Sequence, residues 1–187
     1  MKTKFWIILH HSGVRLKDQP NQFLPINNYH RQKWNSKSSL GYYGGYQSII
    51  EGLGEIKHYR KVGERGIHCN YMNDRSIGIC IAGNLDVDNI TKEQQDALRG
   101  LVVRLMAKYN IPLQRVVGHN HFAQRICPGK NLSKKLVDIL VSGEIIQHNN
   151  PNEIALLKKT VDILQKLIVV YVKLLEMWKG REATITK

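Results

Sequence analysis

The sequence predicts an α/β domain, built as one central mixed β-sheet flanked by helices, with an amphipathic helix following it. Two observations support this fold class: apolar strand-like runs alternate with amphipathic helical segments, and the 187 residues suffice for one well-packed domain plus an appendage. The expected organisation is a domain over residues 1–142, a linker over 143–152, a helix over 153–179 and a tail over 180–187.

The predicted sheet begins with Phe5 to Leu9, which is apolar at every position and suits a strand buried on both faces. Ser76 to Ala82 has the same character. Residues 46–50 and 55–59 predict a hairpin around a glycine-containing turn. A short strand is expected over 115–117.

The predicted helices differ in how clearly the sequence marks them. Residues 26–34 place apolar side chains on one helical face. Thr91 and Gln94 form a capping-box pattern that opens a helix ending at Tyr109. Residues 132–141 predict a closing helix.

The C-terminal segment starts with helix-capping residues at 150–153 and then keeps an unbroken three-four apolar alternation. A second apolar stripe, which includes Leu167 and Leu174, runs beside the first. This pattern favours self-association or a partner helix. Packing against the main domain and binding to a membrane surface remain alternatives, the latter because lysines flank the stripe.

The charge of the chain limits its partners. It has 28 Lys and Arg against 15 Asp and Glu, which gives a formal net charge of +13. Such a surface is attracted to nucleic acid, acidic membranes or an anionic cell wall. No nucleic-acid partner is expected, because the sequence has no helix-turn-helix, zinc-finger or aromatic RNA-binding signature.

The N-terminus predicts synthesis in the cytoplasm without a signal peptide. Its apolar run, Phe5 to Leu9, is too short for a signal-peptide core. No apolar run is long enough to span a bilayer. A protein of this kind that acts outside the cell needs another route of release.

The candidate metal ligands are one histidine of the His10–His11 pair at the end of the first strand, and His119 and Cys127 in one polar loop segment. Imidazole nitrogen and thiolate sulfur are ligands that Zn²⁺ accepts readily. Three protein ligands with a fourth position open are typical of catalytic zinc. Neighbouring strand residues point to opposite faces, so only one of His10 and His11 is expected at the site.

Two other interpretations use the same residues. The histidines and the cysteine could be ordinary core residues, since free cysteine is commonly buried. His121 could complete a closed structural site of four ligands. Three cysteines in all (Cys69, Cys80, Cys127) are too few for a disulfide framework.

The ordered motifs resemble a known family, the zinc-dependent N-acetylmuramoyl-L-alanine amidases of the type-2 amidase and peptidoglycan-recognition-protein fold, which include phage lysozyme-type amidases. The resemblance covers residues 4–142 and is carried by Leu-His-His-Ser-Gly at 9–13, Gly-Tyr-Gln at 45–47, the segment 66–78, and the segment 118–129 that ends in Cys-Pro-Gly.

The resemblance implies a zinc ion held by His10, His119 and Cys127, and a catalytic role for Tyr46. Arg125 stands where lytic phage enzymes often carry a catalytic lysine. Arginine cannot shuttle a proton but can stabilise a developing oxyanion.

The resemblance also implies that His68 lines the substrate groove, where it would contact substrate. The expected activity is hydrolysis of the amide between N-acetylmuramic acid and L-alanine, with zinc lowering the pKa of a bound water to about 7. The expected setting is endolysin-like lysis of the cell wall of a phage host, with peptidoglycan as partner.

Two alternatives to an enzyme remain. The chain could bind peptidoglycan without cutting it, although members of the fold that only bind generally lack the cysteine ligand, which Cys127 supplies here. It could also act as a regulator, since some small phage amidases of this family bind the phage RNA polymerase.

Overall fold

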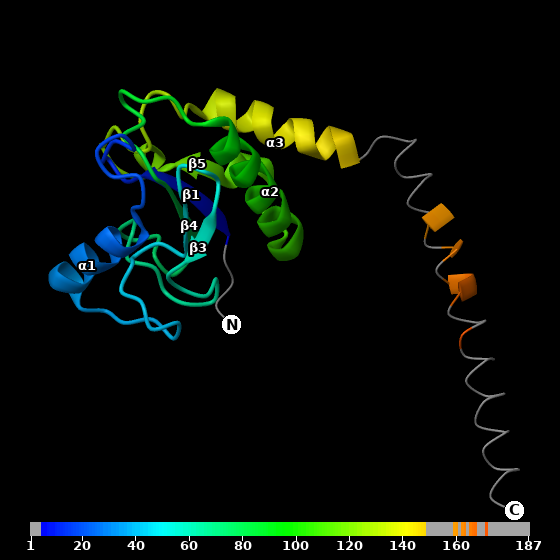
Figure 1. The fold of residues 1–187 in the computed structure, drawn as a ribbon, viewed down its shortest axis with the longest axis horizontal. Coiled ribbons are helices and arrows are strands. Elements are labelled where there is room, and N and C mark those ends of the chain that lie inside the picture. Colours follow the sequence, from blue (N-terminus) through cyan, green and yellow to red (C-terminus); the bar gives the residue numbers. More distant parts are fainter. Residues whose placement is uncertain (1–4, 149–158, 161, 164, 168–170, 172–187) are drawn as a thin grey trace, which may run out of the picture. The chain divides into compact units, whose positions relative to one another are not determined.

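The computed structural model describes residues 5–148 and, further along the chain, residues 159, 160, 162, 163, 165–167 and 171 (Figure 1). The chain forms two compact units, residues 1–144 and residues 145–187, and the first contains the sheet. Among the described residues, no helix combines the length and hydropathy needed to cross a bilayer. In chain order the elements are β1 (Trp6–His11), α1 (Phe23–Trp34), β2 (Ser48–Ile50), β3 (Ile56–His58), β4 (Ser76–Ile81), α2 (Lys92–Tyr109), the 3₁₀ turn η1 (Leu113–Arg115), β5 (Val116–Gly118), η2 (His119–His121) and α3 (Lys134–His148).

The five strands form one mixed sheet in the order β3-β2-β4-β1-β5. Strand β1 pairs in parallel with β4 on one side and with β5 on the other. Strand β2 is parallel to β4, and β3 is antiparallel to β2. The predicted mixed sheet is thus confirmed, including the hairpin at its edge.

The register of β1 determines what meets at the carboxyl edge of the sheet. Leu9 lies opposite Gly118 of β5, and His10 lies opposite Cys80 of β4. Since the carboxyl ends of parallel strands share one edge, the residues that follow β1 and β5 come together there.

Helices cover both faces of the sheet, with α1 on one side and α2 and α3 on the other (Figure 1). On the face of α1, Phe23 packs with Ile49, Tyr59 and Cys80. On the opposite face, Leu9 of β1 and Val137 of α3 line the same cavity. Leu9 and His10 therefore belong to different layers, as alternation along a strand requires.

The capping box of α2 is present as predicted. The side chain of Thr91 accepts from the backbone N–H of Gln94, and the side chain of Gln94 accepts from the backbone N–H of Thr91. The amide nitrogen of the Gln94 side chain also donates to the carbonyl of Ala82, at 2.7 Å. One residue therefore both starts the helix and attaches it to the end of β4.

Two helix boundaries differ from the sequence-based expectation. Helix α1 begins at Phe23 rather than at residue 26, and α3 runs from Lys134 to His148 rather than over 132–141. The predicted linker over 143–152 therefore begins inside α3. The described positions between 159 and 171 are helical, but most of the predicted C-terminal helix lies outside the described residues, so its self-association stays a prediction.

The early start of α1 comes from a carboxylate that is distant in sequence. Glu51 follows β2, is 3% exposed, and its Oε1 accepts from the backbone N–H of Phe23 at 2.8 Å. Both of its oxygens also accept from the backbone N–H of Gln22, at 3.2 and 3.1 Å. A helix start has free N–H groups and a positive dipole end, so a buried carboxylate stabilises it.

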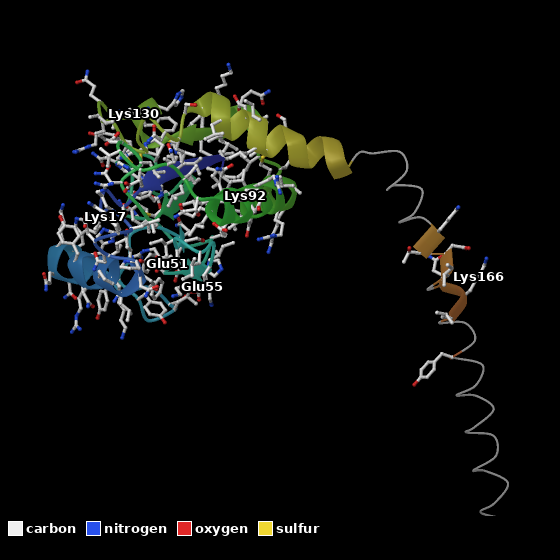
Figure 2. The ribbon with its side chains drawn as sticks, turned by 45° about the horizontal axis from the view of Figure 1, so that its top comes forward. Lys17, Glu51, Glu55, Lys92, Lys130 and Lys166 are labelled. Carbon is white, nitrogen blue, oxygen red and sulfur yellow. The ribbon has the colours of Figure 1, made fainter. Side chains whose placement is uncertain are left out.

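We predict that Glu51→Ala lowers the free energy of unfolding by about 2 kcal/mol, because buried N–H groups lose a charged acceptor. Glu55→Ala is the matched control, since Glu55 lies on the same turn between β2 and β3 (Figure 2) and is largely exposed in its ion pair with Lys57. Such surface pairs contribute little to stability. Urea unfolding of both variants measures the difference, and equal losses would contradict the capping role.

Candidate functional site

The site is built on the end of β1. His10 is 2% exposed and lies on the same face as Ile8. Because Leu9 is opposite Gly118, the next residue of each strand is a histidine, and the rings of His10 and His119 lie with centroids 4.5 Å apart. Parallel pairing alone therefore brings together two residues that are far apart in sequence.

The loop after η2 returns Cys127 to the same place. The backbone N–H of Asn120 donates to the carbonyl of Cys127 at 2.8 Å, which closes the loop. Gly118 permits this return, because a Cβ there would lie 2.5 Å from Cδ of Pro128. Gly129 has φ +99°, a conformation that favours glycine, and it lies close against the backbone of Leu85.

His10, His119 and Cys127 form a cluster whose potential ligand atoms all lie within 4.8 Å of one another. The Sγ of Cys127 is 3.7 Å from Nδ1 of His10. Two imidazoles and one thiol are a donor set that suits zinc. Within the part of the chain that the structure describes, His121 is not in the cluster, and its ring packs against Trp6 and Phe122.

Burial keeps the histidines of the cluster neutral. It lowers the pKa of His10 well below its usual value, and the nearby rings of His68 and His119 lower it further. Burial also lowers the pKa of His119, and the positive charge of Arg125 acts in the same direction. A neutral imidazole offers the lone pair that a metal ion requires.

The thiol of Cys127 is protonated in the metal-free protein. Burial raises its pKa to about 11, although the backbone N–H of His11 acts against this rise. A metal ligand must be a thiolate, so binding of a metal here displaces one proton.

His11 points away from the cluster. Its Nδ1 accepts from the backbone N–H of Leu85 at 3.0 Å. The ring of His11 therefore joins β1 to the segment that follows β4. Of the two adjacent histidines, His10 belongs to the cluster and His11 stabilises the fold.

Tyr46 lies beside His10, with ring centroids 5.1 Å apart. It packs against the cluster of buried residues that contains Cys80 and Tyr59. Burial raises the pKa of the Tyr46 hydroxyl well above its usual value, and the thiols of Cys80 and Cys127 add to the rise. The phenol is therefore a neutral hydrogen-bond donor near the cluster.

The backbone that carries Tyr46 is fixed by helix α1. The Nδ1 of His30, a buried residue, accepts from the backbone N–H of Gly45 at 2.9 Å. Burial lowers the pKa of His30 to about 4, with the charges of Lys33 and Arg60 acting in the same direction. His30 is thus a buried hydrogen-bond acceptor.

A groove of about 670 Å³ opens beside the cluster. It is lined mainly by aromatic, basic and amide side chains from α1, from the segment before β4 and from the loop after β5. The lining includes Lys33, Trp34, Tyr46, His68, His119 and Arg125. Arg125 is exposed, and His68 is partly buried.

His68 is held in place by its own segment. The side-chain oxygen of Asn73 accepts from the backbone N–H groups of His68 and Cys69, at 2.8 and 3.0 Å. The backbone N–H of Ile67 donates to the carbonyl of Gly45 at 2.8 Å. The segment that carries His68 is thereby attached to the segment that carries Tyr46.

Two residues have structural rather than catalytic surroundings. Gln47 is fully buried, and its side chain accepts from the N–H of Gly78 and donates to the carbonyl of Glu64. The carboxylate of Glu64 accepts from the backbone N–H groups of Ser39 and Lys61. No local sequence pattern predicts either arrangement or the role of Asn73.

Comparison with known sequences places the chain in a family. The model of the N-acetylmuramoyl-L-alanine amidase family matches residues 4–130. The endolysin of Escherichia phage T7 is 34% identical over 95 residues, which cover 48% of this chain and 62% of the endolysin. Peptidoglycan-recognition protein SC2 of Drosophila melanogaster is 31% identical over 89 residues, which cover 47% of this chain and 48% of that protein. The chain thus spans less than two thirds of the length of these relatives.

Solved structures show the same fold. The N-acetylmuramoyl-L-alanine amidase LysC from Clostridium intestinale URNW superposes with a TM-score of 0.64 and 27% identity, over 75% of this chain and 86% of LysC. Drosophila PGRP-LB superposes with a TM-score of 0.61 and 24% identity, over 73% of this chain and 81% of PGRP-LB. The resemblance and the fold class predicted from the sequence are confirmed.

The low pKa of His30 predicts a pH-dependent loss of stability. Between about pH 6.5 and pH 4, His30 is protonated in the unfolded chain but stays neutral in the folded chain. The contribution of His30 to the free energy of unfolding is therefore complete above pH 6.5 and is lost as the pH falls to 4. We expect this to amount to about 2–3 kcal/mol.

His30→Asn tests this, because asparagine keeps an acceptor for Gly45 without titrating. The free energy of unfolding of wild type minus that of the variant, measured by urea unfolding, should fall by about 2–3 kcal/mol between pH 7 and pH 4. An advantage that is constant over this range would show that His30 is not buried as a neutral ring.

Proposed function

Because the chain belongs to the N-acetylmuramoyl-L-alanine amidase family, we propose that it hydrolyses the amide bond between N-acetylmuramic acid and L-alanine in peptidoglycan. The observation that carries this proposal is the triangle of His10, His119 and Cys127 beside a groove. Two neutral imidazoles and one thiol of this kind suit a zinc ion and leave a fourth position for solvent or substrate.

The three residues would hold Zn²⁺, and the ion, when bound, supplies a Lewis acid and a nucleophilic water at neutral pH. The protein contributes the dry surroundings of His10 and the closed loop that returns Cys127. Because the ligands come from β1, from the residue after β5 and from this loop, the sheet fixes two of the three.

Two side chains can stabilise negative charge on the amide oxygen. Tyr46 has a raised pKa and stays protonated, and its hydroxyl is hydrogen-bonded to the thiol of Cys80. It can stabilise that oxygen by turning its proton from Cys80 to the substrate. Arg125 stays positively charged and cannot shuttle a proton, so its contribution is electrostatic. It lines the groove beside His119, whose pKa its charge lowers.

The groove suits a ligand that joins a sugar to a peptide. Trp34 lines its wall with Nζ of Lys33 over the indole ring, and Lys33 and Arg125 offer positive charge. His68 also lines the groove, in agreement with a place next to the substrate. The net charge of +13 favours approach to an anionic wall. Action on the wall after release from the cytoplasm of the producing cell is part of this proposal.

A binding module without catalysis is the alternative, since peptidoglycan-recognition proteins are among the relatives. Cys127 favours the enzyme, because its Sγ lies 3.7 Å from His10 and completes a ligand set that a binding protein does not need. A protein that binds peptidoglycan but frees no amino termini would support the alternative.

The regulatory role is a separate alternative, and a pull-down with phage RNA polymerase would test it.

We predict that purified protein contains about one zinc per chain and releases new L-alanine amino termini from peptidoglycan. A chelator should remove both the metal and the activity. Cys127→Ser and His119→Ala should lose zinc and hydrolysis, whereas His121→Ala should keep both, because His121 lies outside the cluster. Elemental analysis and amino-terminus labelling measure these outcomes, and hydrolysis that survives chelation would refute the zinc mechanism.

We predict that Arg125→Ala lowers kcat by about 10²–10³-fold, the usual cost of losing one donor to a developing oxyanion. Arg125→Lys should retain most of the rate, because it keeps the charge. The control is Lys130→Ala, which removes an exposed cation outside the groove. An unchanged kcat with a raised KM would instead give Arg125 a role in substrate binding only.

A further inference from the structure

The two ring nitrogens of His10 face different residues. Its Nδ1 lies 3.7 Å from Sγ of Cys127, whereas its Nε2 lies 3.0 Å from Nδ1 of His68. A neutral imidazole carries one proton, so the ring can present a lone pair to a metal through Nδ1 only if the proton is on Nε2. What lies against Nε2 therefore decides whether His10 can act as a ligand.

A series of hydrogen bonds runs from Nε2 of His10 through His68 and ends at a backbone carbonyl. Nε2 of His68 lies 3.4 Å from Oγ of Ser76, which donates to the carbonyl of Met72 at 2.6 Å. The carbonyl can only accept, so the single hydroxyl proton of Ser76 points to Met72. Oγ of Ser76 is then left to accept from His68, which requires the proton of His68 to be on its Nε2.

The same argument continues to the metal cluster. With its proton on Nε2, His68 has a lone pair on Nδ1 and accepts from Nε2 of His10. His10 is then protonated on Nε2 and has its lone pair on Nδ1, the atom that faces Cys127. The carbonyl of Met72 thus fixes the direction of every bond in the series.

The position of the His68 ring is built into the fold. A Cβ at Gly66 would lie 2.5 Å from Cδ2 of His68, and a Cβ at Gly78 would lie 2.6 Å from its Cγ. The ring therefore occupies space that two glycines leave open, one of them on β4. With the backbone held by Asn73, the ring has little freedom to turn away from His10.

We propose that His68 is a positioning residue that holds His10 in the tautomer whose Nδ1 is free to bind the metal. This inference rests on the zinc site of the proposed function. Both ring nitrogens of His68 are engaged within the protein, so its polar contacts serve His10 and Ser76 although the residue also lines the groove. Partners of this kind commonly change metal affinity by about 10- to 100-fold.

The experiment compares full-length wild type with His68→Phe, which keeps a ring and removes the acceptor, and with His68→Asn, whose Oδ1 can replace Nδ1. Long-range ¹H–¹⁵N spectra of the metal-free proteins report the tautomer of His10, and competition with a chelator gives the Kd for Zn²⁺. We expect the Nε2-protonated tautomer in wild type and a mixture of tautomers in His68→Phe. We also expect Zn²⁺ binding that is about 10- to 100-fold weaker in His68→Phe and recovers in His68→Asn.

Ser76→Ala provides a second test that leaves both rings in place. Without Oγ of Ser76, the proton on Nε2 of His68 loses this acceptor, so His68 should populate both tautomers. Zn²⁺ binding should weaken, but by a smaller factor than in His68→Phe. The control is His58→Phe, a change at an exposed histidine on β3. It should alter neither the tautomers of His10 and His68 nor the Kd for Zn²⁺.

The outcomes separate this inference from the proposed function. If wild type binds Zn²⁺, and His68→Phe and Ser76→Ala keep its Kd and its tautomers, the positioning role is overturned and the zinc site stands. If wild type binds no Zn²⁺, the proposed site fails. The metal-free spectra then still decide whether His68 fixes the tautomer of His10.

Discussion

The parallel pairing of β1 with β5 is the interaction on which the rest of the site depends. Leu9 lies opposite Gly118, so each strand delivers a histidine to the same edge of the sheet. The strands themselves are buried, with Ile7, Ile8 and Leu9 fully inaccessible to solvent. Burial of this apolar surface makes a shift in register costly, and the distance between the two histidines is therefore fixed by the core rather than by the loops.

Close approach between segments completes the site, and glycine makes each approach possible. Gly118 leaves room for Pro128, which returns Cys127 to the strand edge, and Gly66 and Gly78 leave room for the ring of His68. A side chain at any of these positions would collide with the group it now accommodates. The glycines of the sequence motifs thus contribute to the site by leaving space for Pro128 and for the ring of His68.

Burial shapes the chemistry of the site as well as its geometry. It lowers the pKa values of His10 and His30, which keeps both rings neutral, and it raises those of Tyr46 and Cys127. Neutral histidines are suited to binding a cation and to accepting backbone N–H groups. Helix α1 belongs to the same system, since the carboxylate of Glu51 caps it and its His30 holds the backbone of Gly45.

The sequence by itself determined the elements whose signals are local: the apolar strands, the capping box of α2, and the ordered motifs that carry His10, His119 and Cys127. It did not determine the start of α1, whose cap is 29 residues away in Glu51, or the contact of His10 with His68, which are 58 residues apart. Those features depend on which segments the sheet brings together, because a buried hydrogen-bonding group takes whichever partner the packing places beside it. Only the tertiary structure decided that partner, and with it the tautomer inferred for His10.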